Sequence, residues 1–167
     1  MPVPEHKKIR VLFVCLGNIC RSPLAEVVVQ SLADRRGVSH HYHFESAGTG
    51  DWHVGGSADR RSADKAIEHG LDLTAHRAQQ ITAFEINRWD YFVAMDEANY
   101  QALVSMGADA SRLFMMRQFE SQGGEIAADV PDPYYGGNDG FETVYQMLIA
   151  NAAALLDHLE SGALAAP

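Results

Sequence analysis

The chain alternates between short apolar runs and longer stretches in which apolar residues recur at helical spacing. The unbroken apolar run at residues 11–14 is typical of a strand buried on both faces of a parallel sheet, and we predict a strand over residues 9–14. Further strands are predicted at residues 42–46, 89–94 and 112–116. Helices are predicted at residues 23–36, 57–69, 97–105 and 141–161. This alternation favours one α/β domain, with a parallel sheet between helices on both faces.

Short polar residues and glycines set the expected ends of these helices. Ser22 suits the N-cap of the first helix, with Pro23 as its first residue, and Asp96 suits the N-cap of the third. The glycines expected to end helices are Gly37, Gly70 and Gly107. The chain is accordingly divided into a loose leader, a single domain and a flexible tail, at residues 1–8, 9–161 and 162–167.

The composition of the chain excludes several classes of protein. The chain has 167 residues, 47% of them hydrophobic, which is enough for one proper core. Its net charge of −9 argues against nucleic acid or an anionic membrane as a standing partner, and no apolar stretch is long enough to span a bilayer. Only Cys15 and Cys20 could form a disulfide, so the chain is not a disulfide scaffold. Reactive thiols indicate a reducing, cytoplasmic location.

The loop at residues 15–23, Cys-Leu-Gly-Asn-Ile-Cys-Arg-Ser-Pro, joins the first strand to the first helix. Backbone N–H groups and the positive end of a helix dipole make such a turn an anion site. The same field favours the thiolate form of Cys15, which makes it a candidate nucleophile. Arg21 offers a planar guanidinium that matches two phosphate oxygens. A buried structural cysteine and a surface arginine would explain these residues singly, but not their combination.

Other residues of the loop fit the same interpretation. Gly17 lets the backbone turn its N–H groups inward, and Asn18 suits a left-handed backbone that ties the loop to its surroundings. Ser22 can donate its hydroxyl to the sulfur of Cys15. The loop therefore combines a nucleophile, an anion cradle and a cationic clamp.

The sequence at residues 11–26, VLFVCLGNICRSPLAE, resembles the signature of the low-molecular-weight protein tyrosine phosphatases. The blocks SAGTGDW, TAHRA, AMDEAN and DPYYGGNDGFETVY, at residues 46–52, 74–78, 94–99 and 132–145, continue the resemblance in the family's order. The resemblance implies a four-stranded, flavodoxin-like parallel sheet. It also implies a phosphate-binding loop that includes Leu16, Gly17, Asn18, Ile19, Cys20 and Ser22.

Cleavage of a phosphate monoester also requires an acid for the leaving oxygen. Asp132 is a candidate, because the following proline restricts its backbone and a carboxyl beside a bound dianion favours its protonated form. The residues alone leave a solvated acidic turn equally open, and Asp129 and Asp139 are interpreted as solvated. The resemblance assigns the general acid to Asp132. No metal and no cofactor is expected.

The resemblance also implies roles around the loop. Trp52, Tyr134 and Tyr135 are expected to form walls of the substrate pocket, although Trp52 could instead only cover the core. Ser46 and His76 are expected to hydrogen-bond Asn18 and hold the loop in shape.

Cys20 has two interpretations that stay open. Relatives with both cysteines bridge them on oxidation, which implies that Cys20 protects an oxidised Cys15, whereas a small buried filler explains its spacing equally well. The three clustered histidines, His40, His41 and His43, are interpreted as solvated rather than metal-binding, since no cysteine or carboxylate stands at ligand spacing.

These observations predict an enzyme that hydrolyses phosphotyrosine in proteins, and aryl phosphates, through a cysteinyl phosphate. Phosphoprotein substrates and inorganic phosphate or similar oxyanions are the expected ligands. An arsenate reductase of the same fold would need cysteines after Cys20, and there are none. A protein-arginine phosphatase usually has threonine in place of Ile19, and a non-catalytic phosphotyrosine-binding module would not need Asp132. The sequence leaves the substrate protein and the oligomeric state open.

Overall fold

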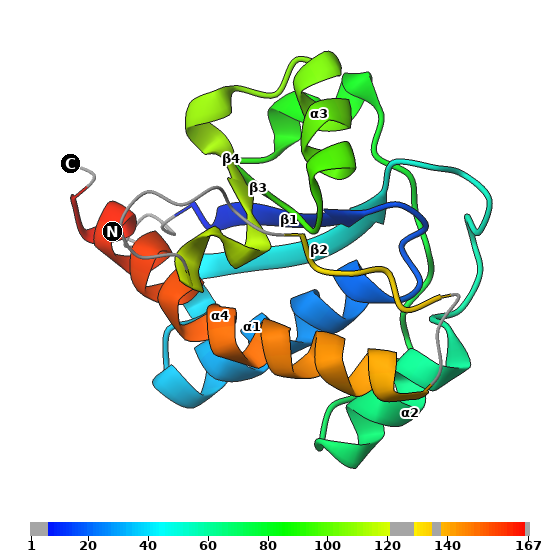
Figure 1. The fold of residues 1–167 in the computed structure, drawn as a ribbon. Coiled ribbons are helices and arrows are strands. Elements are labelled where there is room, and N and C mark those ends of the chain that lie inside the picture. Colours follow the sequence, from blue (N-terminus) through cyan, green and yellow to red (C-terminus); the bar gives the residue numbers. More distant parts are fainter. Residues whose placement is uncertain (1–6, 121–128, 135–137, 166–167) are drawn as a thin grey trace.

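The structure is a computed structural model that describes residues 7–120, 129–134 and 138–165 (Figure 1). Its centre is a four-stranded sheet in the order β2-β1-β3-β4, in which every neighbouring pair is parallel. The strands are β1 (Ile9–Cys15), β2 (Tyr42–Gly48), β3 (Tyr91–Ala94) and β4 (Leu113–Met115). The predicted parallel α/β fold is confirmed.

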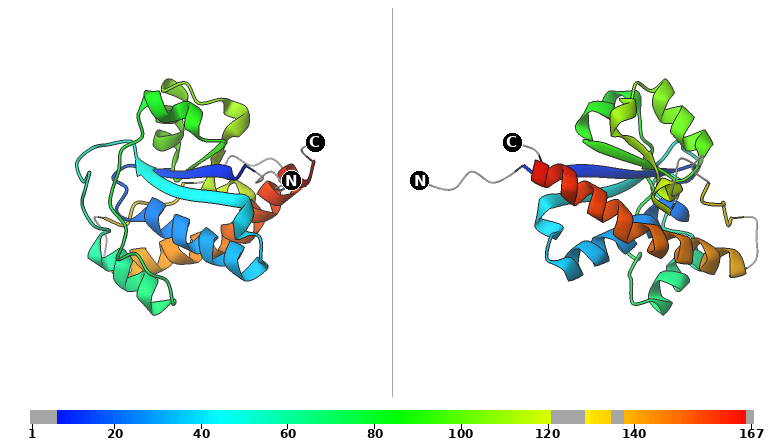
Figure 2. Two further views of the ribbon diagram at one scale, coloured as in Figure 1. Left: turned by 180° about the vertical axis from the view of Figure 1, so that it is seen from behind. Right: turned by 60° about the vertical axis from the view of Figure 1, so that its left-hand side comes forward.

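Helices cover both faces of this sheet (Figures 1 and 2). One face carries α1 (Arg21–Arg36), α2 (Arg60–Glu68) and α4 (Asn138–Ala165), and the other carries α3 (Glu97–Ser105). Short 3₁₀ turns complete the connections at Ser39–His41, Ala83–Arg88, Ala110–Arg112 and Met116–Glu120.

The apolar run of β1 is buried on both faces, as its sequence predicts. Val11 and Phe13 belong to the core cluster beneath α1 and α4, whereas Leu12 and Val14 belong to the cluster that includes Leu103 of α3. Successive side chains of a strand point to opposite faces, so each face of the sheet receives two of the four. The predicted apolar face of α4 is likewise buried, through Val144, Leu148, Ala152, Leu155 and Leu159.

Four of the predicted helix ends are confirmed, and one predicted cap is wrong. Gly70 and Gly107 follow the ends of α2 and α3 with left-handed φ angles of 77° and 100°. Gly37 ends α1 in the left-handed region at φ 70°, and Asp96 caps α3 by accepting a hydrogen bond from the N–H of Asn99. Helix α1 begins at Arg21 with Cys20 at the N-cap, so Ser22 lies inside the first turn. The Ser22 hydroxyl is engaged with the side chains of Cys15 and Asn18 instead.

The predicted end of the last helix at residue 161 is wrong, because α4 continues to Ala165. Gly162, the first residue of the predicted tail, lies within this helix and does not adopt the left-handed backbone of a helix stop. A glycine within a helix costs only about 1 kcal/mol relative to alanine, which the packing of α4 outweighs. Residues 1–6 of the predicted leader and residues 166–167 of the tail lie outside the described residues.

Candidate active site

The loop between β1 and α1 lies at the carboxyl edge of the sheet, where ligands bind in open α/β folds. Gly48, at the end of β2, pairs with Cys15, and a Cβ there would lie 2.7 Å from the backbone oxygen of Leu16. The end of β2 therefore supports the loop at a distance that only glycine allows.

Two hydrogen-bond donors converge on the sulfur of Cys15. The backbone N–H of Asn18 donates to Sγ at 3.2 Å, and Ser22 Oγ lies 2.9 Å from Sγ. Ser22 Oγ accepts a hydrogen bond from Asn18 Nδ2 at 2.8 Å, and its own hydrogen has two acceptors within reach, Cys15 Sγ at 2.9 Å and the more distant backbone oxygen of Ala47 at 3.5 Å. Two hydrogen bonds thus hold the sulfur of Cys15 at the end of β1.

Asn18 connects the loop to its surroundings. It has a left-handed backbone at φ 57°, and its side chain is fully buried. Nδ2 donates to Ser46 Oγ at 3.0 Å, while Oδ1 accepts from the backbone N–H of Gln79 at 2.9 Å. The carbonyl of Asn18 lies 2.7 Å from His76 Nε2, which must carry the hydrogen because a carbonyl only accepts. Burial lowers the pKa of His76, so the ring is neutral at neutral pH and does not act as a free base.

Hydrogen bonds to acceptors behind the pocket hold the side chain of Arg21 in place. Its side chain is only 3% exposed, and Nη1 donates to Asp96 Oδ2 at 2.7 Å and to the backbone oxygen of Val130 at 3.1 Å. Nη2 lies 3.5 Å from Asp132 Oδ2. These contacts fix the guanidinium next to Cys15 and Asp132.

A cavity of about 360 Å³ opens above the loop and brings many of the predicted site residues together. It is lined by Cys15, Leu16, Gly17, Ile19, Cys20, Arg21, Trp52, His53, Asp132 and Tyr134. The loop residues Asn18 and Ser22 lie behind the lining, with Ser46 and His76 in contact with Asn18. Tyr135 lies outside the described residues.

Trp52 stands at the mouth of this cavity with 70% of its surface exposed, so it does not merely cover the core. Its ring packs over Gly50, where a Cβ would fall 1.9 Å from a ring atom. His53 was missed in the sequence, although it follows Trp52 directly; its ring packs over Gly17 and lies 6.1 Å from the ring of Tyr134. These rings give the cavity flat walls.

Asp96 and Asp129 also have contacts that the sequence analysis did not assign. Asp96 was expected only to cap a helix, yet it also binds Arg21. The available signal was its position after β3, because the carboxyl ends of parallel strands meet at one edge. Asp129, interpreted as solvated, accepts a hydrogen bond from the backbone N–H of Glu97 at 2.9 Å.

The two cysteines differ in their surroundings. Both are free and buried, and both line the cavity. Burial raises the pKa of the Cys20 thiol well above its usual range, and the nearby carboxylate of Asp59 adds to this effect. Cys20 is therefore a thiol at neutral pH, without the paired donors that surround Cys15.

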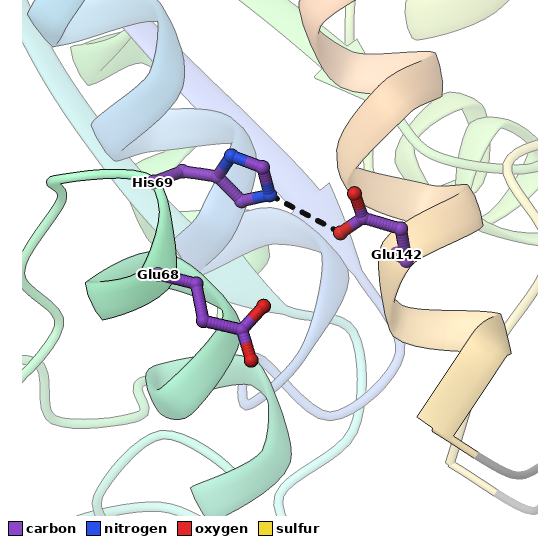
Figure 3. Close-up of side chains that lie close together, drawn as sticks. All are labelled: Glu68, His69 and Glu142. Carbon is purple, nitrogen blue, oxygen red and sulfur yellow. Dashed lines mark hydrogen bonds and ion pairs between the residues drawn. The ribbon is translucent and has the colours of Figure 1, made fainter.

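Histidines outside the site pair with carboxylates. His41 Nδ1 lies 3.2 Å from Glu160, and His43 Nε2 lies 2.5 Å from Glu45. Within the described residues, the side chains of Glu68, His69 and Glu142 also come close enough to hold a cation, with ligand atoms within 4.8 Å of one another (Figure 3).

An ammonium group already supplies positive charge to this Glu68–His69–Glu142 cluster. Lys65 Nζ lies 2.8 Å from Glu68 Oε2 and 3.3 Å from Glu142 Oε2. The hydrogen bond between His69 and Glu142, above all, lowers the pKa of Glu142 to about 2. The arrangement is thus explained as an ion-pair cluster that joins α2 to α4.

Over the described ranges, no helix is both long and apolar enough to cross a membrane.

Comparisons with known proteins agree on one family. The family model described as "Low molecular weight phosphotyrosine protein phosphatase" matches residues 10–163. A low molecular weight protein-tyrosine-phosphatase of Streptomyces coelicolor is 41% identical over 152 residues, covering 88% of this chain and 91% of that protein. The crystal structure of YfkJ from Bacillus subtilis has a TM-score of 0.85 at 34% identity, covering 94% of this chain and 98% of that one. A protein tyrosine phosphatase from Entamoeba histolytica, crystallised with Hepes in the active site, has a TM-score of 0.84 at 34% identity, covering 93% and 99%.

Proposed function

We propose that Cys15, Arg21 and Asp132 carry out the reaction of this chain, which belongs to the low molecular weight protein-tyrosine phosphatase family. Members of this family are hydrolases of phosphoproteins, and so is this chain. The observation that carries this proposal is the pair of donors, Ser22 Oγ–H and Asn18 N–H, directed at Cys15 Sγ in the cavity that Asp132 also lines. A sulfur held in this way is an activated nucleophile.

The reaction proceeds in two steps. Cys15 Sγ forms a bond to phosphorus while the bond to the phenolic oxygen breaks, and Asp132 transfers its proton to that oxygen. Water then attacks the cysteinyl phosphate, Asp132 takes a proton from it, and inorganic phosphate leaves as the thiolate is restored. Arg21 and the loop N–H groups hold the equatorial oxygens in both steps.

The walls of the cavity favour an aromatic leaving group. Ile19 and Leu16 are apolar, and Trp52 and Tyr134 offer ring faces beside the reacting centre. A phosphorylated arginine side chain would bring a charged guanidinium against Ile19, which cannot hydrogen-bond it. We therefore propose phosphotyrosine as the substrate group, with inorganic phosphate and similar oxyanions as ligands of the loop. That no metal, nucleic acid or membrane is a partner stays a prediction from the sequence. The free Cys15 and Cys20 thiols support a cytoplasmic location.

The assignment of Asp132 is tested by changing the leaving group. Asp132→Asn is expected to slow phosphotyrosine cleavage by about 10²–10⁴-fold, since it removes the proton donor. The loss in kcat/KM should shrink for phosphate esters of acidic phenols, whose oxygens leave without a proton. Asp139→Asn, at an exposed position at the start of α4, is the matched control and should behave as wild type. Equal losses for all leaving groups would reject Asp132 as the acid.

We propose a protective role for Cys20, supported by its place beside Cys15 in the cavity lining. Peroxide would convert Cys15 to a sulfenic acid, and Cys20 would lose its proton, attack that sulfur and release water, leaving a disulfide. A thiol reductant should then restore wild-type activity, whereas Cys20→Ser should keep catalysis but lose this recovery. Intact mass and peptide mapping check the cross-link. Sulfinic Cys15 beside a free Cys20, at low peroxide in the wild type, would contradict the proposal.

A further inference from the structure

We propose that Asp129 is a positioning residue for the general acid: its carboxylate fixes the segment that carries Asp132 to the start of α3. This inference rests on the proposed role of Asp132. Asp129 does not touch the cavity, and it acts three residues away from the acid.

Three hydrogen bonds tie the segment from Asp129 to Asp132 to two other parts of the fold, the turn between β3 and α3 and the side chain of Arg117. Asp129 Oδ1 accepts the backbone N–H of Glu97 at 2.9 Å, and its backbone oxygen accepts from Arg117 Nη1 at 2.8 Å. The next residue, Val130, is fully buried and donates its N–H to the carbonyl of Met95 at 2.7 Å. The segment thus lies along the turn between β3 and α3.

This anchored stretch connects directly to the reacting groups. The carbonyl of Val130 accepts from Arg21 Nη1 at 3.1 Å, and Arg21 Nη2 lies 3.5 Å from Asp132 Oδ2. Pro131 follows Val130, which limits how far the chain can turn between the anchor and Asp132. A shift at Asp129 would therefore move the Asp132 carboxyl relative to the leaving oxygen.

Asp129 is not redundant with the cap that α3 already has. Asp96 accepts the N–H of Asn99, whereas Asp129 accepts the N–H of Glu97, the first residue of the helix. The two carboxylates satisfy different donors, and a negative charge at a helix N-terminus is favoured by the helix dipole. Asp129 therefore ties the segment that carries Asp132 to the start of α3, whereas Asp96, at the same end of the helix, orients Arg21.

The test compares Asp129→Ala, Asp129→Asn and the control Asp109→Ala. Asp109 is a matched aspartate, because it is exposed and caps a short helix by accepting the N–H of Ser111, away from the cavity. The measured quantity is kcat/KM for phosphotyrosine and for the phosphate ester of an acidic nitrophenol, together with the inhibition constant of inorganic phosphate.

Asp129→Ala is expected to lower kcat/KM for phosphotyrosine by about three- to tenfold, the effect of one lost hydrogen bond on the acid's position. It should leave the nitrophenyl ester and phosphate inhibition within about twofold of wild type, since neither depends on protonation of the leaving oxygen. Asp129→Asn should restore phosphotyrosine cleavage, because its amide oxygen accepts the same N–H. Asp109→Ala should match wild type in every measurement.

Equal losses on both esters would make Asp129 a merely structural residue and overturn the inference. The inference would also fail if Asp129→Asn were as impaired as Asp129→Ala, because an accepted hydrogen bond would then not be the cause. Asp132→Asn is measured alongside. If the loss of kcat/KM in Asp132→Asn does not depend on the leaving group, the proposed role of Asp132 is wrong. If that loss depends on the leaving group but the loss in Asp129→Ala does not, only the inference about Asp129 is rejected.

Discussion

The side chains proposed to react and the side chains that hold them form two shells around one sulfur. Cys15, Arg21 and Asp132 line the cavity, whereas Asn18 and His76 lie behind it. The outer residues carry no charge at neutral pH and offer donors and acceptors that tie the loop to β2 and to the segment at residues 76–79. Such preorganisation lowers the cost of binding a dianion.

The neutral His76 predicts how stability depends on pH. Burial lowers its folded-state pKa below the unfolded value of about 6.5. Above pH 6.5 neither state binds the proton; as the pH falls below 6.5, the unfolded state binds it first and folding is progressively destabilised. His76→Gln keeps an N–H donor for Asn18 but does not titrate. Urea unfolding between pH 8 and 5 should show a smaller loss of stability in His76→Gln than in wild type, and an equal loss would contradict this assignment.

At the scale of elements, the site depends on how closely β2 approaches the loop after β1. At Gly48 a new Cβ would meet only backbone, 2.7 Å from Leu16 O and 3.1 Å from the carbonyl carbon of Gly17, so the loop itself would have to move. Gly48→Ala is expected to cost about 1–3 kcal/mol of stability, as overpacking does. It should lower kcat/KM by up to about 10²-fold, as a displacement of roughly 1 Å in a site can do.

Gly162→Ala is the matched control for this substitution. Gly162 lies within α4, where a Cβ would meet only Tyr91 Oη at an ordinary 3.7 Å. Alanine should raise the free energy of unfolding by about 0.5–1 kcal/mol and leave kcat/KM unchanged. Thermal melts and steady-state kinetics check both variants. A Gly48→Ala enzyme as active as the Gly162→Ala enzyme would show that the loop tolerates a displaced β2.

At the scale of the whole molecule, the sequence predicts those features that residues close together in the chain determine. The apolar run at residues 11–14 sufficed to predict the central strand, and the loop after it contains its nucleophile, clamp and anion-binding backbone within eight residues. Contacts between distant segments could not be derived in this way. The bond from Arg21 to Asp96 spans 75 residues and that from Glu97 to Asp129 spans 32. Apart from the position of Asp96 after β3, the sequence carries no signal for either contact.

Local rules also failed where tertiary contacts outweighed them. Ser22 has the residue type of an N-cap, but its hydroxyl is bound to Asn18 and Cys15 inside the first turn of α1. Gly162 has the residue type of a helix stop, but α4 continues through it. In both cases a propensity of about 1 kcal/mol competes with hydrogen bonds or packing that the local sequence does not encode.

The central claim, that Cys15 carries the phosphoryl group between the two steps, is tested most directly by trapping that group. Asp132→Asn should form the intermediate from an acidic phenyl phosphate, which needs no acid, and hydrolyse it slowly because the base is absent. Acid quench within one turnover, followed by intact mass and peptide mapping, is predicted to find one phosphoryl group on Cys15, and none in the Cys15→Ser enzyme. Steady turnover with Cys15 unmodified, or with the phosphoryl group on another residue, would contradict the account.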